Sequence, residues 1–155
     1  MGRTIRSLLA AVLVCCAAAR ADVAFSATAG SFTEVGDGWD GFNHDYSATI
    51  WHVFDQMVLF GVTAGMQIDG GDHQFPLLAS LYVRLPLGRQ LLPVATSDFG
   101  WVFGDGANEC AWRVGGGLDL KLGDRSSLLL LAGSQMGLDA LPTRAYLRGG
   151  ILLEF

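Results

Sequence analysis

Three histidines are the side chains in this sequence that could serve as a catalytic base. His44 and His73 fall in polar stretches between apolar runs, whereas His52 lies within a run, near Ser47. A serine nucleophile needs such a base within hydrogen-bond reach, but strand alternation would point His52 and Ser47 to opposite faces. The sequence contains no Gly-x-Ser-x-Gly or Cys-x-x-Cys motif. We therefore predict no catalytic residue and no cofactor site.

Acidic side chains gather in one short Gly-rich stretch, residues 37–45, which contains Asp37, Asp40 and Asp45. Carboxylates around flexible glycines suit Ca²⁺, but their spacing is not that of an EF-hand loop. We interpret the stretch as a solvated acidic segment, and the three aspartates are the candidates for a divalent-cation site.

The first 21 residues have the form of a secretion signal. A basic start and an apolar run from Ser7 to Ala19 precede Ala19-Arg20-Ala21, which fits the small-x-small cleavage rule. Residues 22–155 would then be the mature domain. The alternatives are an uncleaved anchor and a lipoprotein, although neither Cys15 nor Cys16 follows a small residue.

Cleavage at this site would leave a strongly acidic domain. All 15 acidic residues lie beyond residue 21, with seven of the ten Lys and Arg, so the net charge would be −8. Phosphate contacts need clustered Lys and Arg, which argues against nucleic-acid binding. Only Cys110 would remain, so no internal disulfide is expected.

The rest of the chain alternates apolar with polar residues in runs of about ten. Apolar residues make up 51% and charged residues 16%, yet no apolar run of 18 residues follows the N-terminal segment. Eight such runs, divided by Gly- and Asp-rich turns, are typical of a transmembrane β-barrel. We expect strands at about 23–32, 46–54, 57–68, 76–87, 92–103, 110–122, 127–138 and in the segment that ends at Phe155. The parity of the second is ambiguous, because both of its faces carry apolar residues.

The expected connections alternate in length. The second, fourth and sixth are short, at residues 55–56, 88–90 and 123–125, whereas the first and third are longer, at 33–45 and 69–75. Outer-membrane barrels combine short periplasmic turns with longer outer loops. The sequence thus predicts an all-β, eight-stranded antiparallel up-and-down transmembrane barrel. A soluble barrel of the lipocalin type is the rival, in which the apolar face would form the interior.

Charged side chains of both signs share the face opposite the apolar one. The interior of an eight-stranded barrel is just wide enough for its own side chains, and buried charges must be paired. We therefore predict that an ion-pair network plugs the lumen, made of Arg84, Asp98, Arg113, Asp119, Lys121, Arg144, Arg148 and Glu154.

The C-terminal strand carries a family resemblance. In the C-terminal assembly signal of bacterial outer-membrane barrels, a polar residue, a glycine and two apolar residues have fixed places, filled here by Arg148, Gly150, Leu153 and Phe155. Together with three further segments, this strand resembles small outer-membrane β-barrels of the OmpA/OmpX-like superfamily: Phe60–Gly65, Phe75–Arg84 and Pro93–Trp101. The resemblance implies an outer-membrane location, contact with lipopolysaccharide and recognition by the barrel-assembly machinery.

The resemblance implies little about activity. We predict a non-enzymatic outer-membrane barrel with a structural or surface-interaction role. A lipid A-modifying enzyme and a soluble periplasmic binding barrel are the alternatives. The expected outer loops carry only acidic charges, and divalent cations that bridge them to lipopolysaccharide phosphates are a hypothesis. These acids are Glu34, Asp37, Asp40, Asp45, Asp69, Asp72, Asp105, Glu109 and Asp139.

Overall fold

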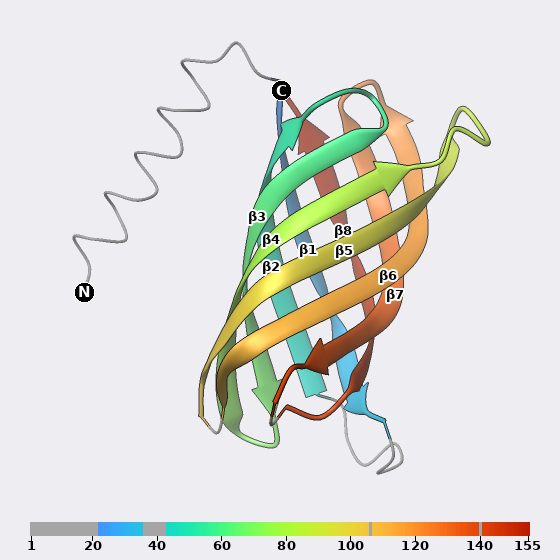
Figure 1. The fold of residues 1–155 in the computed structure, drawn as a ribbon. Helices are drawn as coiled ribbons and strands as arrows, with labels where there is room; N and C mark the ends of the chain where they lie inside the picture. Colours follow the sequence, from blue (N-terminus) through green and yellow to red (C-terminus); the bar gives the residue numbers. More distant parts are fainter. Residues whose placement is uncertain (1–21, 36–42, 106, 140) are drawn as a thin grey trace.

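Eight strands close into one barrel (Figure 1). The computed structural model describes residues 22–35, 43–105, 107–139 and 141–155, so the predicted signal segment lies outside the described residues. Within these ranges, no helix has the length and apolar character needed to cross a membrane. The strands are β1 (Val23–Glu34), β2 (Asn43–Val53), β3 (Val58–Asp69), β4 (Asp72–Arg84), β5 (Leu91–Gly104), β6 (Ala107–Gly123), β7 (Ser126–Gly137) and β8 (Arg144–Glu154).

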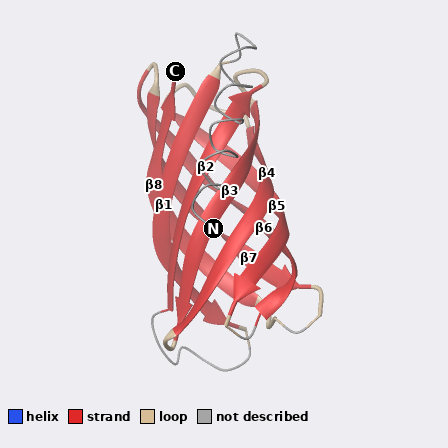
Figure 2. Ribbon diagram, turned by 90° about the vertical axis from the view of Figure 1, so that its left-hand side faces the viewer, coloured by secondary structure: helices blue, strands red, loops and turns tan. Residues whose placement is uncertain are grey.

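Every strand pairs antiparallel with its neighbour in the chain, and β8 pairs with β1 to close the sheet. The closing pair runs from Ala24 opposite Glu154 to Glu34 opposite Arg144. The start of β1 and the end of β8 therefore lie at the same end of the barrel, called here the terminal end (Figures 1 and 2). The opposite end is called the loop end. The predicted fold class is confirmed.

Alternation along each strand sends apolar side chains outward and polar ones inward. On β6, Leu118 and Leu120 are exposed whereas Asp119 is buried, and on β4 Leu81 is exposed whereas Tyr82 is buried. The rival soluble barrel, with an apolar interior and a solvated charged face, is therefore wrong. The exposed apolar wall is the surface that a bilayer would cover.

The ambiguous parity of β2 is settled by Trp51. Its side chain is buried in the lumen and its Nε1 donates a hydrogen bond to Ser26 Oγ at 2.9 Å. The neighbouring His52 faces outward and is exposed. Trp51 can occupy the polar side because its ring N–H finds a partner there.

Each strand places at least one small residue outward near its middle, and these residues form a belt on the outer wall, called here the waist. The larger apolar side chains lie on either side of this waist, with Phe25 and Phe60 toward the terminal end and Phe75 and Trp101 toward the loop end. Two such bands correspond to the aromatic girdles of transmembrane barrels. The waist residues are Ala27, Ala48, Ala64, Ala79, Ala95, Gly116, Ala132 and Gly149.

The third and fourth connections differ from the prediction. The third was expected at residues 69–75, but β3 and β4 are joined by Gly70-Gly71 alone. Both glycines have positive φ, 57° and 116°, as a two-residue hairpin turn requires. The fourth spans residues 85–90 rather than 88–90. β4 ends before Pro86, which has no N–H for the ladder. Loop length is therefore a poor guide to the two ends of the barrel.

Candidate functional site

The lumen is the candidate site, because the buried charges point into it. At the terminal end, Arg84 Nε lies 2.7 Å from Asp119 Oδ2, and Arg84 Nη2 lies 2.6 Å from Glu154 Oε1. Lys121 Nζ lies 2.7 Å from the same Glu154 oxygen. Tyr82 donates its hydroxyl to Asp119 Oδ2 at 3.1 Å. Arg84, Asp119, Lys121 and Glu154 form the terminal-end cluster, in which two cations meet two carboxylates.

A second group of charges, the central cluster, lies deeper and consists of Asp45, Asp98, Arg113 and Arg148. Asp45 Oδ2 lies 3.1 Å from Arg148 Nη2 and 3.7 Å from Arg113 Nη2. Asp98 is buried and accepts a hydrogen bond from Ser80. Here too, two cations are balanced by two carboxylates.

Two glutamines connect the members of the central cluster. Gln67 Nε2 donates to Asp45 Oδ2 at 3.2 Å and to Gln135 Oε1 at 3.1 Å. Arg113 Nε donates to the same Gln135 oxygen at 2.6 Å. The two amides thus link the carboxylate to the guanidinium of Arg113, whose direct ion pair with Asp45 is long.

Asp45 was predicted to lie in an outer loop and to be a candidate cation ligand, and this placement is wrong. β2 begins at Asn43 rather than at residue 46, and alternation turns Asp45 inward, where its side chain is fully buried. Asp37 and Asp40 lie outside the described residues. Across residues 22–35, 43–105, 107–139 and 141–155, no group of three His, Cys, Asp or Glu side chains is placed to hold a metal ion.

The third group, at the loop end, is centred on Arg144. Its Nη2 lies 2.8 Å from Asp69 Oδ2 and 3.3 Å from Glu34 Oε1, and its Nη1 donates to Gln74 Oε1 at 2.7 Å. The guanidinium also lies over the Phe32 ring, 4.7 Å from the ring centre. Glu34 and Asp69 were expected in solvated loops, but strand pairing extends far enough to bring them to this arginine.

Glu109 was also expected in an outer loop, and this too is wrong, because β6 begins at Ala107 and Glu109 is buried. Its carboxylate accepts a hydrogen bond from the backbone N–H of Leu141 at 2.5 Å. Leu141 packs with Val102 and Ala111, so this contact holds part of the β7–β8 connection against the loop end of the lumen.

An apolar layer separates the terminal-end cluster from the central cluster. Leu129 and Leu152, which break the polar pattern of β7 and β8, are two of its members. Leu129 is paired with Asp119 in the sheet, and Leu152 is two residues from Glu154, so the layer borders the terminal-end cluster. In the sequence, these leucines stand out only as apolar residues on the polar face of their strands. The layer comprises Ala24, Trp51, Leu59, Tyr82, Val94, Leu129, Leu131 and Leu152.

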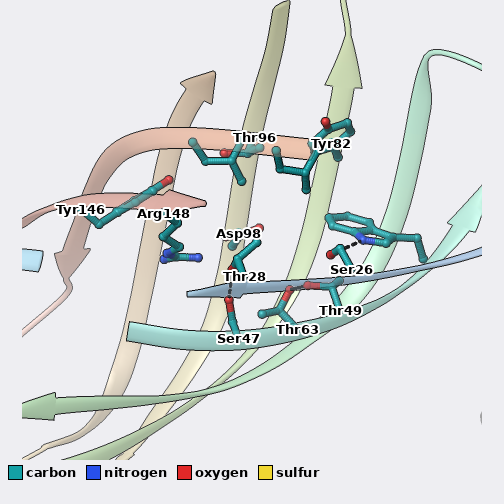
Figure 3. A pocket seen from close by; sticks show the side chains of 13 residues that line it. Ser26, Thr28, Ser47, Thr49, Thr63, Tyr82, Thr96, Asp98, Tyr146 and Arg148 are labelled. Atoms are coloured by element: carbon teal, nitrogen blue, oxygen red, sulfur yellow. Dashed lines mark hydrogen bonds between the residues drawn. The ribbon is translucent and has the colours of Figure 1, made fainter. Parts of the chain in front are cut away.

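Hydroxyl side chains fill the space between the apolar layer and the central cluster (Figure 3). Thr63 Oγ1 is 2.7 Å from Thr49 Oγ1 and 2.6 Å from Ser80 Oγ. Thr28 Oγ1 and Ser47 Oγ face each other at 2.7 Å. These side chains surround a cavity of about 30 Å³, called here the hydroxyl pocket, which Asp98, Tyr146 and Arg148 also line. The hydroxyl residues of the pocket are Ser26, Thr28, Ser47, Thr49, Thr63 and Thr96.

Two glycines make room for the Tyr146 ring. A Cβ on Gly115 or Gly133 would collide with the Tyr146 hydroxyl. The guanidinium of Arg148 lies 4.2 Å from the centre of the same ring. These glycines therefore leave space in the lumen for a long side chain.

The three histidines lie away from the lumen. His44, His52 and His73 all face outward and are exposed. Within the described part of the chain, we find no histidine ring hydrogen-bonded to a serine hydroxyl or to a carboxylate. The His52 ring instead meets Phe54 edge-on, with centroids 6.3 Å apart.

The four residues of the expected assembly signal have different surroundings. Arg148 belongs to the central cluster, and a Cβ on Gly150 would collide with the Ala27 carbonyl. Leu153 lies on the outward face, and Phe155 is 70% exposed while its N–H donates to the carbonyl of Val23 at 2.8 Å. The terminal aromatic is therefore held by its backbone and presents its ring outward.

Comparisons with known proteins find similarity in structure only. No protein-family model matches the sequence, and a search of curated proteins finds no match. The solution structure of outer membrane protein H (OprH) from P. aeruginosa matches with a TM-score of 0.66 and 15% identity, over 87% of this chain and 100% of that one. The N-terminal β-barrel domain of Pseudomonas aeruginosa OprF matches with a TM-score of 0.62 and 13% identity, over 85% and 97%.

An enzyme is among the similar structures as well. The outer membrane enzyme PagL matches with a TM-score of 0.56 and 15% identity, over 84% of this chain and 98% of that one. Similarity at such low identity concerns the fold. The expected outer-membrane location agrees with this fold and with the apolar outer wall. The chain has the fold of the small outer-membrane β-barrels, which is the fold that the resemblance to the OmpA/OmpX-like superfamily implied.

Proposed function

We propose that the protein is a non-enzymatic outer-membrane barrel with a structural or surface-interaction role, and that its lumen is closed. The observation that carries the proposal is the charge balance inside the barrel. The terminal-end cluster and the central cluster each contain two cations and two carboxylates, and Asp119, Glu154 and Asp45 lie within ion-pair distance of a cation. Paired, hydrogen-bonded charges of this kind fill a lumen.

The burial of the charged side chains in the lumen supports the same conclusion. Arg84, Asp119, Arg113 and Asp45 are all at most 2% exposed, so water does not reach these side chains through a continuous opening. A conducting pore needs a wetted path whose lining is strongly biased toward one sign of charge when it selects ions. The hydroxyl pocket, at about 30 Å³, is a small cavity.

The first experiment measures ionic conductance across planar lipid bilayers that contain the refolded protein. We expect no discrete conductance steps above those of the protein-free bilayer, because no open path crosses the lumen. Reproducible steps from the wild-type barrel would refute the closed-lumen proposal. Heat-dependent mobility on an SDS gel checks that the sample is folded.

The structural similarity to an outer-membrane enzyme makes lipid modification the rival function. The outward histidines without serine or carboxylate partners argue against it. Mass spectrometry of lipid A compares cells that express the wild type, the double variant His52→Ala/His73→Ala, and no protein. We expect the same acylation in all three. A change that depends on the wild type and is lost in the double variant would favour the enzyme.

The C-terminal strand is proposed as the contact for the barrel-assembly machinery. The exposed ring of Phe155 supports this role, since the structure gives it no buried packing site. Deletion of Phe155 should lower the amount of barrel assembled in cells, measured by heat-modifiable protein in the outer-membrane fraction. The stability of the refolded variant should stay close to that of the wild type, and an equal loss of both would contradict a specific role in assembly.

The loop end is proposed to face lipopolysaccharide. Asp72, Asp105 and Asp139 are exposed there, which supports an acidic surface beside the lipid headgroups. A divalent cation between these acids and lipopolysaccharide phosphates stays a prediction. Calorimetric titration of the refolded barrel with Ca²⁺ tests it, and absence of binding heat would end it.

A further inference from the structure

The lumen contains two kinds of obstacle in series, ion pairs and one apolar layer. In the terminal-end cluster, Arg84 contacts both Asp119 and Glu154, so it keeps a carboxylate partner when either contact opens. In the central cluster, Asp45 likewise forms ion pairs with two arginines, Arg113 and Arg148. A water molecule or ion that enters either cluster therefore meets polar atoms to which it can bind. Arg84 and Asp45 can therefore each open one ion-pair contact while keeping the other.

The apolar layer offers no such partners. Only two of its members carry a polar side-chain atom, Trp51 and Tyr82, whose rings contact each other with centroids 5.7 Å apart. Trp51 donates its N–H to Ser26 Oγ in the hydroxyl pocket. Tyr82 donates its hydroxyl in the opposite direction, to Asp119 in the terminal-end cluster. Each polar group is thus used at one border of the layer, and the aliphatic side chains between them have no donor or acceptor.

The hydroxyl pocket, on the other side of the layer, is suited to water. Its volume of about 30 Å³ gives room for about two water molecules, which also need several polar partners each. Such partners are present in the chain from Thr49 through Thr63 to Ser80. Arg148 lines the pocket, is buried, and its Nε has no hydrogen-bond partner among the described residues. Figure 3 shows Arg148 and Asp98 pointing toward the same space as the threonines.

We propose that, among the side chains that fill the lumen, the apolar layer rather than the ion pairs sets the resistance to water and ions, and that the hydroxyl pocket is a water-binding site that borders this layer. Water avoids a narrow apolar constriction, which blocks ions although no atom fills the whole cross-section. An ion in the layer would lose its hydration without gaining a polar partner. This inference rests on the proposed closed lumen and assigns the closure to particular side chains.

The test compares neighbouring positions on β7. Leu129 and Leu131 belong to the layer, whereas Leu128 and Leu130 face outward. The full-length protein is refolded into phosphatidylcholine vesicles that contain a pH-sensitive dye, and proton entry is followed after an external pH jump. Leu129→Ser/Leu131→Ser should raise the entry rate about tenfold or more by wetting the constriction. Leu128→Ser/Leu130→Ser is the matched control and should leave the rate close to that of the wild type.

A third variant, Glu154→Gln, removes the carboxylate shared by Arg84 and Lys121 and should also leave the rate close to that of the wild type. The inference is overturned if protons enter vesicles with Glu154→Gln as fast as vesicles with the layer variant, or if folded layer variants show the same entry rate as the wild type. Folding of each sample is checked by heat-dependent gel mobility. Leu131→Thr is the milder substitute should the double variant not fold, and it should leak more than Leu130→Thr. A leaky wild type would instead refute the proposed closed lumen, so the two failures are distinguishable.

Discussion

The two charge-balanced clusters of the lumen both pair charged side chains inside the barrel, but they lie at different depths. In the terminal-end cluster the contacts are direct, at 2.6 to 2.7 Å, and the side chains of Lys121 and Glu154 remain 20% and 22% exposed. In the central cluster the two ion pairs of Asp45 measure 3.1 and 3.7 Å, and the side chains of Asp45 and Arg113 are fully buried.

The difference shows what depth demands of a buried charge. Near the mouth, water can still solvate a lysine or glutamate, so two or three contacts are enough. Deep in the barrel the protein must supply the missing hydrogen bonds, because an unpaired buried charge is very costly. Gln67 and Gln135 supply some of them to Asp45 and Arg113. The central cluster should therefore be more sensitive to substitution than the terminal-end cluster.

The largest effect is expected at Asp45. Asp45→Ala would leave Arg113 and Arg148 without their shared carboxylate, and loss of one partner of a buried pair costs about 3–5 kcal/mol. The free energy of unfolding in urea, measured for the barrel refolded in lipid vesicles, provides the test. A loss below about 1 kcal/mol would mean that depth does not distinguish the clusters as we argue.

The lipid-facing wall gives a second measure of depth, outside the lumen. Leu118 faces outward on the same strand as Arg113, and Leu118→Arg should cost about 2–4 kcal/mol at mid-membrane depth. Leu122→Arg, on the same face near the terminal end, should cost only about 0–1 kcal/mol. Unfolding of both variants by urea makes the comparison, and equal losses would contradict the assigned orientation of β6 in a membrane.

An intermediate effect is expected at Gln135, which links Arg113 to Gln67. Gln135→Leu keeps much of the volume but removes the amide, and a buried donor left without its partner costs about 1–3 kcal/mol. The same unfolding experiment measures it. If Gln135→Leu were neutral, the amide would contribute little beyond filling space.

The smallest effect is expected at Lys121. Lys121→Met removes a contact to Glu154 that is partly exposed, and ion pairs of this kind contribute about 0–1 kcal/mol. Arg84 remains beside Glu154 in the variant. Unfolding in urea measures the change, and high salt should reduce the already small difference in the free energy of unfolding between the variant and the wild type. A loss of stability as large as that of Asp45→Ala would remove the contrast between the two clusters.

The strand pattern made most of the architecture predictable. Alternation alone placed Arg84, Arg113 and Asp119 on the inward face, because the side chains of a strand point alternately to its two sides. It failed where a polar segment continues a strand. Asp45 was assigned to a loop, since hydrophilic residues near glycines have the composition of a turn even when they pair within a sheet.

Strand number, the two faces and the balance of charges were determined by the sequence alone, because they depend on local periodicity and composition. The tertiary structure decided which carboxylate meets which guanidinium, as with Arg84 and Glu154, 70 residues apart. It also decided that Leu129, Leu131 and Leu152 meet in one layer. Such contacts follow from the stagger between strands and from barrel closure, and the period of a single strand contains neither.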